Sequence, residues 1–391
     1  MGQRAKVAVF SALFLCLGGS LPVRAGSFAG KGEGTTSADF LRLPVGARPS
    51  GMAEAFTGVA DDVHALAYNP AGIAFLARQE LGLVHDSYAP GINHEWLGYV
   101  HPLRFGTYGL AMNVFLVDPF DSYSQFDTFE NQTSAMDAAL QFSYGLRISD
   151  SWAVGGSGKY ITSRLNTTKA STVAGDLGTL WAPTRGVRLG ASVFHLGNGL
   201  RYVSETSPLP ITTRLGASWT PYDPRDFMHY FTLALDGVQV QGHGVQVSGA
   251  IELWYQGIMA LRLGSRSDAG AGTGYTGGVG LYVFRDPHRP CEVGFDYSFT
   301  DAGDFAQTHR ASVVLKFGQT LREERRGTVI EWRRARDQAA PVRQREERKR
   351  EREKERARLA PQSSAPEPEK YQPVKESEMI LSPDYKKWVR P

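Results

Sequence analysis

The sequence predicts an all-β fold: a fourteen-stranded antiparallel transmembrane β-barrel of the outer-membrane kind, with a short N-terminal helical plug and a charged C-terminal tail that is α-helical or disordered. Two observations predict it. Segments of about ten residues alternate between apolar and polar side chains, which is typical of strands that separate two solvents. After residue 25, no stretch approaches the roughly 18 continuous apolar residues that a membrane helix needs.

Residues 1–25 have the composition of a secretory signal peptide. The basic residues Arg4 and Lys6 precede an apolar run, and a small-residue cleavage pattern ends at Ala25. The remaining chain keeps one cysteine, Cys291, which forms no intrachain disulfide. An exported chain without a membrane helix is periplasmic, secreted or an outer-membrane barrel, and the strand pattern favours the barrel.

Residues 26–78 are predicted to form a plug, or hatch, before the first strand. Asp61 and Asp62 suit the start of a short helix, because carboxylates favour the positive end of the helix dipole. Pro70 ends that helix, since proline donates no hydrogen bond and disfavours helical backbone before it. Gly72 then permits a tight reversal. The predicted plug motif comprises Asp61, Asp62, Asn69, Pro70, Ala71 and Gly72.

Residues 79–318 are predicted to form the transmembrane barrel. The segment from Met136 to Ile148 places apolar side chains on one face and polar ones on the other, and the same period of two recurs downstream. Many segments reach ten residues, the length that a tilted membrane strand needs. The fourteen expected strands are 79–88, 94–102, 105–118, 135–148, 151–165, 171–182, 186–197, 209–220, 227–238, 244–255, 257–267, 273–285, 291–301 and 308–317.

The connections between these strands differ in length. Residues 149–150, 183–185 and 256 are tight turns, whereas 118–134 and 198–208 are long loops on the alternate side. Short turns face the periplasm in such barrels, so both chain ends are expected there. Five aromatic residues then fall on the periplasmic rim, where amphipathic rings are favourable. They are Trp152, Trp181, Trp219, Trp254 and Phe317, the last also marking the C-terminal strand.

The alternative to a membrane barrel is a large soluble sandwich or barrel, in which alternation is equally expected and tryptophans mark a core. Fourteen long strands in meander order with aromatic residues at one rim favour the membrane barrel.

The polar face of the strands is predicted to line the lumen. Confined charges must pair or be hydrated, so we expect ion pairs against the plug and some trapped water. Such residues are structural in most barrels, and ligand contact is the alternative. The lumen-facing charged candidates are Asp137, Arg147, Lys159, Asp176, Arg188, Arg214, Glu252, Arg262, Asp296, Arg310 and Lys316.

The tail differs from the rest of the chain. Residues 319–360 are dense in both charge signs, and pairs such as Glu346 with Arg350 have the spacing of a solvated helix, so a charged periplasmic arm is predicted. Residues 361–391 are predicted to be a disordered linker and a C-terminal peptide, which is either a recognition peptide or a frayed end. Interleaved glutamates weaken phosphate binding, so no nucleic acid is expected; anionic lipid or peptidoglycan suits the arm better.

The sequence contains no convincing motif for catalysis, cofactor binding or metal binding. The glycine pattern at 272–277 matches a dinucleotide-binding fingerprint, but no helix follows it and no βαβ unit surrounds it. Histidine, serine and aspartate are scattered without a nucleophile context, and no metal-ligand spacing occurs. The chain is therefore predicted to be no enzyme and to need no cofactor.

The run from Gly34 to Phe75 resembles the N-terminal signature of the PorV/PorQ family of outer-membrane barrels, distant relatives of the FadL long-chain fatty-acid transporters. Residues 159–161, 174–178, 195–197, 209–210, 296–299 and 308–310 resemble further landmarks, so the similarity covers roughly residues 33–318. The resemblance implies a fourteen-stranded barrel in the bacterial outer membrane, with the N-terminal segment packed into the lumen. The tail departs from PorV.

Two functional hypotheses follow from that resemblance. One is a FadL-like channel that passes hydrophobic small molecules, with an apolar pocket beneath the outer loops. The other is a non-transporting scaffold or a partner of type IX-like protein secretion. The partners expected for the protein are outer-membrane lipid and, in the scaffold hypothesis, a periplasmic or secretion-machinery protein bound by the tail.

Overall fold

The computed structural model describes residues 36–202, 204–221, 229–267, 273–283, 291–301, 307–318 and 351–355. The chain forms two compact units, Met1–Arg326 and Gly327–Pro391, and of the second unit only residues 351–355, which are helical, are described. The predicted signal peptide (1–25), the start of the plug (26–35), most of the arm (319–360) and the C-terminal peptide (361–391) lie outside the described residues.

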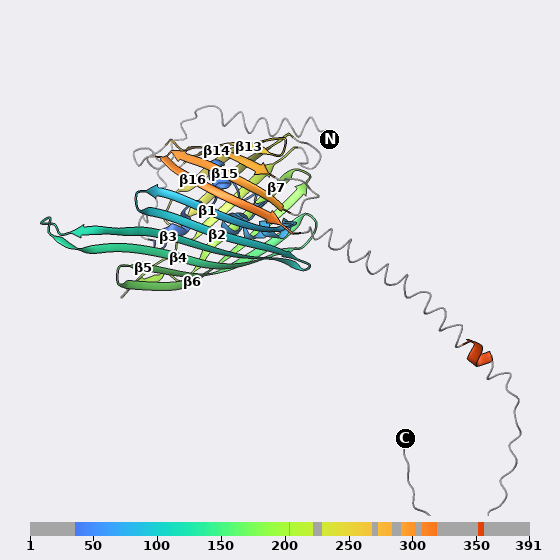
Figure 1. Ribbon diagram of the computed structural model, residues 1–391, viewed down its shortest axis with the longest axis horizontal. Helices are drawn as coiled ribbons and strands as arrows, with labels where there is room; N and C mark the ends of the chain where they lie inside the picture. Colours follow the sequence, from blue (N-terminus) through green and yellow to red (C-terminus); the bar gives the residue numbers. More distant parts are fainter. Residues whose placement is uncertain are drawn as a thin grey trace, which may run out of the picture. The chain divides into compact units, whose positions relative to one another are not determined.

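Fourteen strands pair into one closed antiparallel barrel, which confirms the predicted fold (Figure 1). Each barrel strand pairs with the next one along the chain, and β1 closes the barrel against β16, with Gln79 opposite Phe317. The barrel strands are β1 (Gln79–Ala89), β2 (Ile92–Leu103), β3 (Gly106–Tyr123), β4 (Phe129–Arg147), β5 (Trp152–Leu165), β6 (Thr168–Thr184), β7 (Val187–Gly197), β10 (Thr212–Trp219), β11 (Tyr230–Val240), β12 (Val245–Tyr255), β13 (Met259–Arg266), β14 (Tyr275–Val283), β15 (Cys291–Asp301) and β16 (Gln307–Phe317).

The predicted long loop at 118–134 is mostly strand. β3 and β4 continue as a hairpin, with Phe120 opposite Thr133, and only residues 124–128 connect them. A register shift between Val117 and Phe120 accommodates Pro119, which cannot donate to a strand ladder. The connection between β7 and β10 holds a small two-stranded sheet of β8 (Leu200–Tyr202) and β9 (Glu205–Ser207).

Within residues 36–78, the described part of the chain before the barrel, there are four short helical elements. They are η1 (Asp39–Arg42), α2 (Ala47–Gly51), α3 (Ala65–Tyr68) and η2 (Pro70–Phe75). α3 ends at Asn69, whose backbone is extended and whose Oδ1 accepts the N–H of Ala71 at 3.1 Å. The Asn-Pro stop lies where the sequence predicts it, but the helix begins at Ala65 and not at the predicted Asp61 and Asp62. Asp62 does not cap α3: its Oδ1 accepts the His64 N–H at 2.9 Å, and His64 is the N-cap residue.

The two faces of the wall differ sharply. Outward-facing side chains are large and apolar, and Leu140, Val173, Leu177 and Leu215 each leave about 60% of their area exposed. A continuous exterior of this kind is unfavourable in water and suits lipid. No helix among the described residues has the length and hydropathy to cross a bilayer.

The predicted aromatic rim holds for most of its members. Trp152 and Trp181 lie opposite each other on β5 and β6 and are half exposed, and Phe317 stacks on Tyr99. Trp219 is partly exposed, packing edge-on against Phe231.

Trp254 was expected at this rim but points into the barrel. It is 6% exposed and stacks on Tyr230. It shares the inward face with Glu252, two residues earlier on β12, because side chains of a strand alternate between faces.

The inner wall approaches the plug backbone directly at several inward-facing glycines. A Cβ on Gly155 of β5 would lie 2.5 Å from the Ala71 nitrogen, and one on Gly264 of β13 would lie 2.6 Å from the Ala53 nitrogen. Real Cβ atoms do not approach nitrogen so closely. The plug and wall therefore fit each other at the level of the backbone.

Replacing Gly155 with alanine is expected to displace the plug. Overpacking of this kind costs about 1–3 kcal/mol, so the free energy of unfolding should fall and trypsin should cut the plug faster. Gly158→Ala on the same strand is the matched control, because a Cβ there meets nothing within 4 Å. Equal proteolysis of the two variants would contradict the close fit.

Candidate functional site in the plugged lumen

The plug crosses the lumen from one end to the other. We call the end with the 124–128 and 198–211 connections the loop end, and the end with the 148–151 and 256–258 connections the turn end. At the loop end, Ser37 donates its N–H to the Pro208 carbonyl at 2.8 Å. At the turn end, the Arg147 guanidinium lies 4.6 Å above the Phe75 ring. The first described residues thus lie opposite the end at which β1 begins.

An arginine from the plug joins it to the wall. Arg48, on α2, is 6% exposed and binds Glu252 of β12 through two parallel hydrogen bonds of 2.8 Å. Its Nη1 also donates to Asp61 at 2.6 Å and to Asp62 at 2.8 Å. Arg48 therefore ties two parts of the plug to each other and both to the barrel.

The same chain of charges continues through the wall. Arg262 of β13 donates to Glu252 at 2.7 Å and to Asp296 of β15 at 2.6 Å. Tyr282 of β14 donates its hydroxyl to Asp296 at 2.9 Å. We call Arg48, Asp62, Glu252, Arg262 and Asp296 the ion network. Buried charges are tolerable only when paired in this way.

The ionised state of Asp62 is part of this network. Burial would raise the pKa of its carboxyl, but His64 and Arg48 beside it hold that pKa well below its usual range. A lowered folded-state pKa contributes stability above the unfolded value of about 3.9, and this stability is lost only as pH falls through the lowered value. The plug end of the network therefore stays charged under mildly acidic conditions.

A second polar cluster fastens the plug to β1, β2 and β16. Arg310 pairs with Asp86 at 2.6 Å and donates to Ser50 of the plug at 2.6 Å. Asp86 faces His94 Nδ1 at 2.9 Å. Glu80 accepts the Val63 N–H at 2.9 Å, and its other oxygen lies 3.4 Å from Lys316 Nζ.

Further wall side chains bind the plug backbone. Asn69 is a plug side chain that binds backbone carbonyls. Its amide donates to the Thr57 carbonyl within the plug at 3.1 Å and to the Thr179 carbonyl of β6 at 3.0 Å. Hydrogen bonds to plug backbone groups come from Asp236, Gln141, Arg188, Ser192, Ser218, Thr276 and Ser312.

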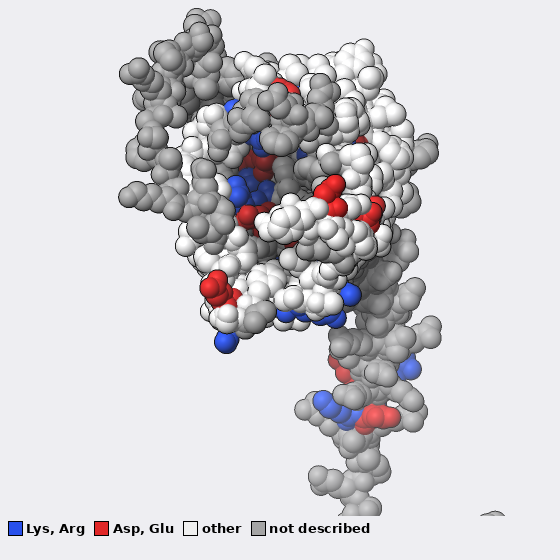
Figure 2. All heavy atoms as spheres, turned by 90° about the vertical axis from the view of Figure 1, so that its left-hand side faces the viewer, with Lys and Arg blue, Asp and Glu red and all other residues white. Residues whose placement is uncertain are grey.

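The loop end holds a third polar cluster. Asp176 of β6 faces inward by the alternation of its strand, whereas Phe194 and His195 of β7 form a β-bulge opposite it, and the left-handed backbone of His195 (φ 64°) accompanies the burial of its side chain. Asp176 accepts the His195 N–H at 3.0 Å, and Lys159 Nζ lies 3.0 Å from the other Asp176 oxygen. Arg214 of β10 pairs with Glu54 of the plug at 3.1 Å. Figure 2 looks onto this end, where side chains of both charges lie inside a hollow.

An apolar cluster adjoins these charges. Phe40 of η1 is 4% exposed and packs, with Leu41 and Leu43, among wall and loop residues. The wall and loop members are Ala139, Ile161, Ala170, Ala174, Leu200 and Leu209, with Phe115 and Tyr202 at the edge. The apolar pocket expected beneath the outer loops is not open in this structure, because Phe40 of the plug is itself a buried member of the apolar cluster.

The charged residues predicted to face the lumen differ in how deeply they are buried. Asp176, Glu252, Arg262, Asp296 and Arg310 are buried and paired as described, and Lys159 and Arg214 are buried at the loop end. Asp137 is half-buried opposite Ser163, and Arg147 is exposed at the turn end.

The plug-motif residues are also placed. Asp61 and Asp62 meet Arg48, Pro70 and Ala71 lie against Gly155, and a Cβ on Gly72 would lie 2.6 Å from that of Ala60. Among the described residues, no group of three or more His, Cys, Asp or Glu side chains is arranged to hold a metal ion.

Five residues that hold the plug or line the lumen were not predicted from the sequence. They are Arg48, Glu54, Glu80, Asp86 and His94. Glu80 and Asp86 could have been predicted, because they are an even number of residues apart on the first strand and therefore lie on the same face of it. No comparable pattern marks Arg48 or Glu54, which lie in short plug elements.

Comparison with known proteins gives a family match and a shared fold. The pattern of the uncharacterised protein family UPF0164 matches residues 19–188. No curated protein matches the chain.

Among solved structures, the TodX deltaS2 mutant monoaromatic hydrocarbon channel has a TM-score of 0.51 at 12% identity, over 70% of this chain and 98% of that one. A Pseudomonas aeruginosa FadL homologue has a TM-score of 0.47 at 12% identity, over 70% and 98%. At such identity the first of these shows a common barrel fold.

Removing one member of the ion network is expected to destabilise the barrel strongly. Glu252→Gln leaves Arg48 and Arg262 without their shared carboxylate, which should cost about 3–5 kcal/mol of unfolding free energy. Asp39→Asn is the control, because Asp39 is half exposed and lies 3.9 Å from Arg42; about 0–1 kcal/mol is expected there. Urea unfolding in detergent measures both, and a loss for Glu252→Gln as small as the control's would contradict the assignment.

Proposed function

We propose that the protein is a bacterial outer-membrane barrel that takes small hydrophobic molecules from outside at its loop end, as a FadL-like channel. The observation that carries this is the apolar cluster around Phe40. It offers a hydrophobic site beneath the outer loops, and a plug residue, which a solute can replace, occupies it. A solute that buries as much apolar area in this cluster as the Phe40 ring does gains a similar free energy of transfer from water.

The plug has two unlike parts, which supports exchange at the loop end. We call residues 36–45 the outer plug segment and residues 46–75 the inner plug. The outer segment bonds to the wall mainly through Ser37, to the carbonyls of Ser207 and Pro208, and through Arg42, to His243 at 3.1 Å.

The inner plug is fastened much more firmly. The ion network, the Arg310 cluster and wall hydrogen bonds all act on residues 46–75. Displacing the outer segment therefore costs far less than displacing the inner plug.

The proposed location follows from the signal peptide and the apolar exterior. Short connections face the periplasm in barrels of this kind, which puts the loop end outside the cell. β16 ends at the turn end, so Gly318, the last described residue of the barrel unit, lies on the proposed periplasmic side.

Phe40→Ala is expected to open the outer site. The substitution removes a ring from the apolar cluster, at a cost of about 3–5 kcal/mol to the packing that holds the outer segment. Purified protein should then bind an apolar fluorescent probe such as 1-N-phenylnaphthylamine several-fold more tightly. Phe75→Ala is the matched control, because Phe75 packs at the turn end.

Two results would count against the channel. One is unchanged probe binding in Phe40→Ala. The other is a deletion strain that takes up apolar probes at the wild-type rate.

A second candidate function is that of a non-transporting scaffold or secretion partner, which the firmly held inner plug favours. In this case the barrel anchors the tail, and the tail binds periplasmic proteins. The PorV/PorQ resemblance motivates this candidate.

Truncation after Gly318 is expected to leave a folded barrel and remove its periplasmic partners, if the scaffold hypothesis is correct. Crosslinked pull-downs with full-length and truncated protein measure this. A variant lacking only residues 361–391 separates the arm from the terminal peptide. Recovery of the same proteins from all three would refute the role of the tail.

A further inference from the structure

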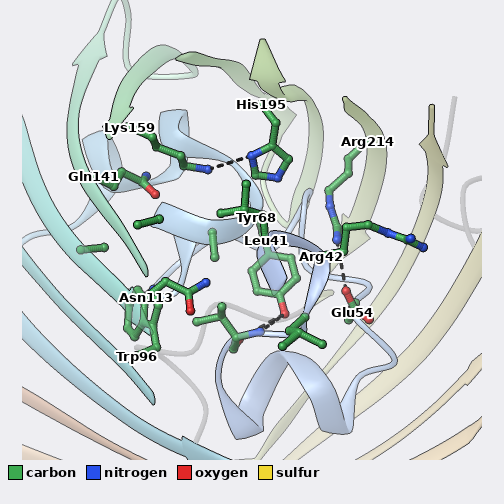
Figure 3. Close-up of a pocket in the computed structure, with 15 residues that line it drawn as sticks. Leu41, Arg42, Glu54, Tyr68, Trp96, Asn113, Gln141, Lys159, His195 and Arg214 are labelled. Carbon is green, nitrogen blue, oxygen red and sulfur yellow. Dashed lines mark hydrogen bonds and ion pairs between the residues drawn. The ribbon is translucent and has the colours of Figure 1, made fainter. Parts of the chain in front are cut away.

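A small cavity lies between the outer plug segment and the wall at the loop end. Its volume is about 40 Å³, and Lys159, His195 and Arg214 line it from the wall, while Arg42 and Glu54 line it from the plug (Figure 3). We propose that this cavity binds one small monovalent anion when the plug is in place. The inference is independent of transport, because it concerns the closed form alone.

Arg214 supplies the first reason. It is 8% exposed, and its Nη2 donates to Glu54, whereas its buried Nη1 has no hydrogen-bond partner. Glu54 cannot fully neutralise it, because its other oxygen lies 3.4 Å from Arg266. A buried guanidinium nitrogen without an acceptor is unfavourable, so an acceptor from outside the chain is expected there.

Lys159 and His195 supply the second reason. Lys159 Nζ lies 3.4 Å from His195 Nδ1, and an ammonium group can only donate. His195 Nδ1 is then the acceptor, so the proton of the neutral ring is on Nε2, which becomes a donor. Asp176 and His195 together take two of the three Lys159 N–H groups. One ammonium hydrogen and the Nε2 hydrogen are left for a ligand.

Asn113 adds a fourth donor group. Its Oδ1 faces His94 Nε2 at 2.7 Å, which leaves its NH₂ group for the cavity that it also lines. The polar groups of the cavity are therefore mostly donors. Three cationic side chains, Arg42, Lys159 and Arg214, face it, against the single carboxylate of Glu54. Asp176 pairs with Lys159 and Asp39 lies 3.9 Å from Arg42, so the surplus is mainly one of hydrogen-bond donors, and it favours an anion over a cation.

The size of the cavity selects a small anion. A water molecule needs roughly 10–15 Å³ of such volume, so the site has room for chloride or a carboxylate group and excludes a bulky anion. The ligand is either a free ion or the carboxylate end of an amphiphile, and both present the same chemistry to Arg214 and Lys159.

The test uses the full-length protein in detergent, in which thermal unfolding is followed while chloride replaces isethionate, a monovalent anion without a carboxylate, at constant ionic strength. The midpoint should rise by roughly 2–4 °C for each tenfold increase in chloride above the dissociation constant. Arg214→Gln and Lys159→Gln should lose this dependence. Arg188→Gln should retain it, because Arg188 is also an inward arginine but donates to the Val59 carbonyl, outside the cavity.

Acetate and octanoate distinguish the two sources. Equal effects of acetate and chloride indicate a free ion, and a much tighter effect of octanoate indicates an amphiphile; either supports an anion site. Broadening of the ³⁵Cl resonance by wild-type protein provides a measurement that does not depend on the folding of a variant. Identical midpoints in chloride, acetate, octanoate and isethionate, together with no broadening, would overturn the proposal.

Discussion

A barrel of fourteen strands encloses more space than its own side chains can fill, since about eight strands already suffice for a filled interior. Here the inward side chains are also charged, so what fills the lumen must supply partners as well as volume. Arg48 meets both needs. It lies in the plug, binds Glu252 of the wall with both arms of its guanidinium, and draws Asp61 and Asp62 into the same cluster. The rest of the lumen is organised around this contact.

The division of the plug follows from where these charges lie. The ion network and the inward glycines act on the inner plug, whereas the outer plug segment covers an apolar cluster with few wall hydrogen bonds. A hydrophobic site that is covered by the chain itself can exchange its occupant without disturbing the buried ion pairs. This separation reconciles a firmly plugged lumen with binding at the loop end, and the anion cavity lies where the two parts meet.

Much of this arrangement was predictable from the sequence. The period of two located all fourteen strands, because each has lipid on one side and a polar interior on the other. Because residues two apart on a strand share a face, the same alternation would have placed Trp254 on the inner face with Glu252. It would also have placed Glu80 and Asp86 on one common face of the first strand. The hairpin beyond Val117 was missed because aspartates and Pro119 indicate a loop, whereas pairing with β4 sustains the strand. The β-bulge of Phe194 and His195 opposite Asp176 and the partners of Arg48 depend on long-range register, which no local pattern encodes.

Native-state hydrogen exchange tests the central claim most directly, because the claim is that the inner plug is as firmly held as the barrel while the outer segment is not. The amides of Thr57 and Val63, which donate to Asp236 and Glu80, should exchange as slowly as those of the barrel strands. The amides of Leu41 and Leu43 should exchange much faster. Fast exchange at Thr57 and Val63, with the strands still protected, would contradict the account.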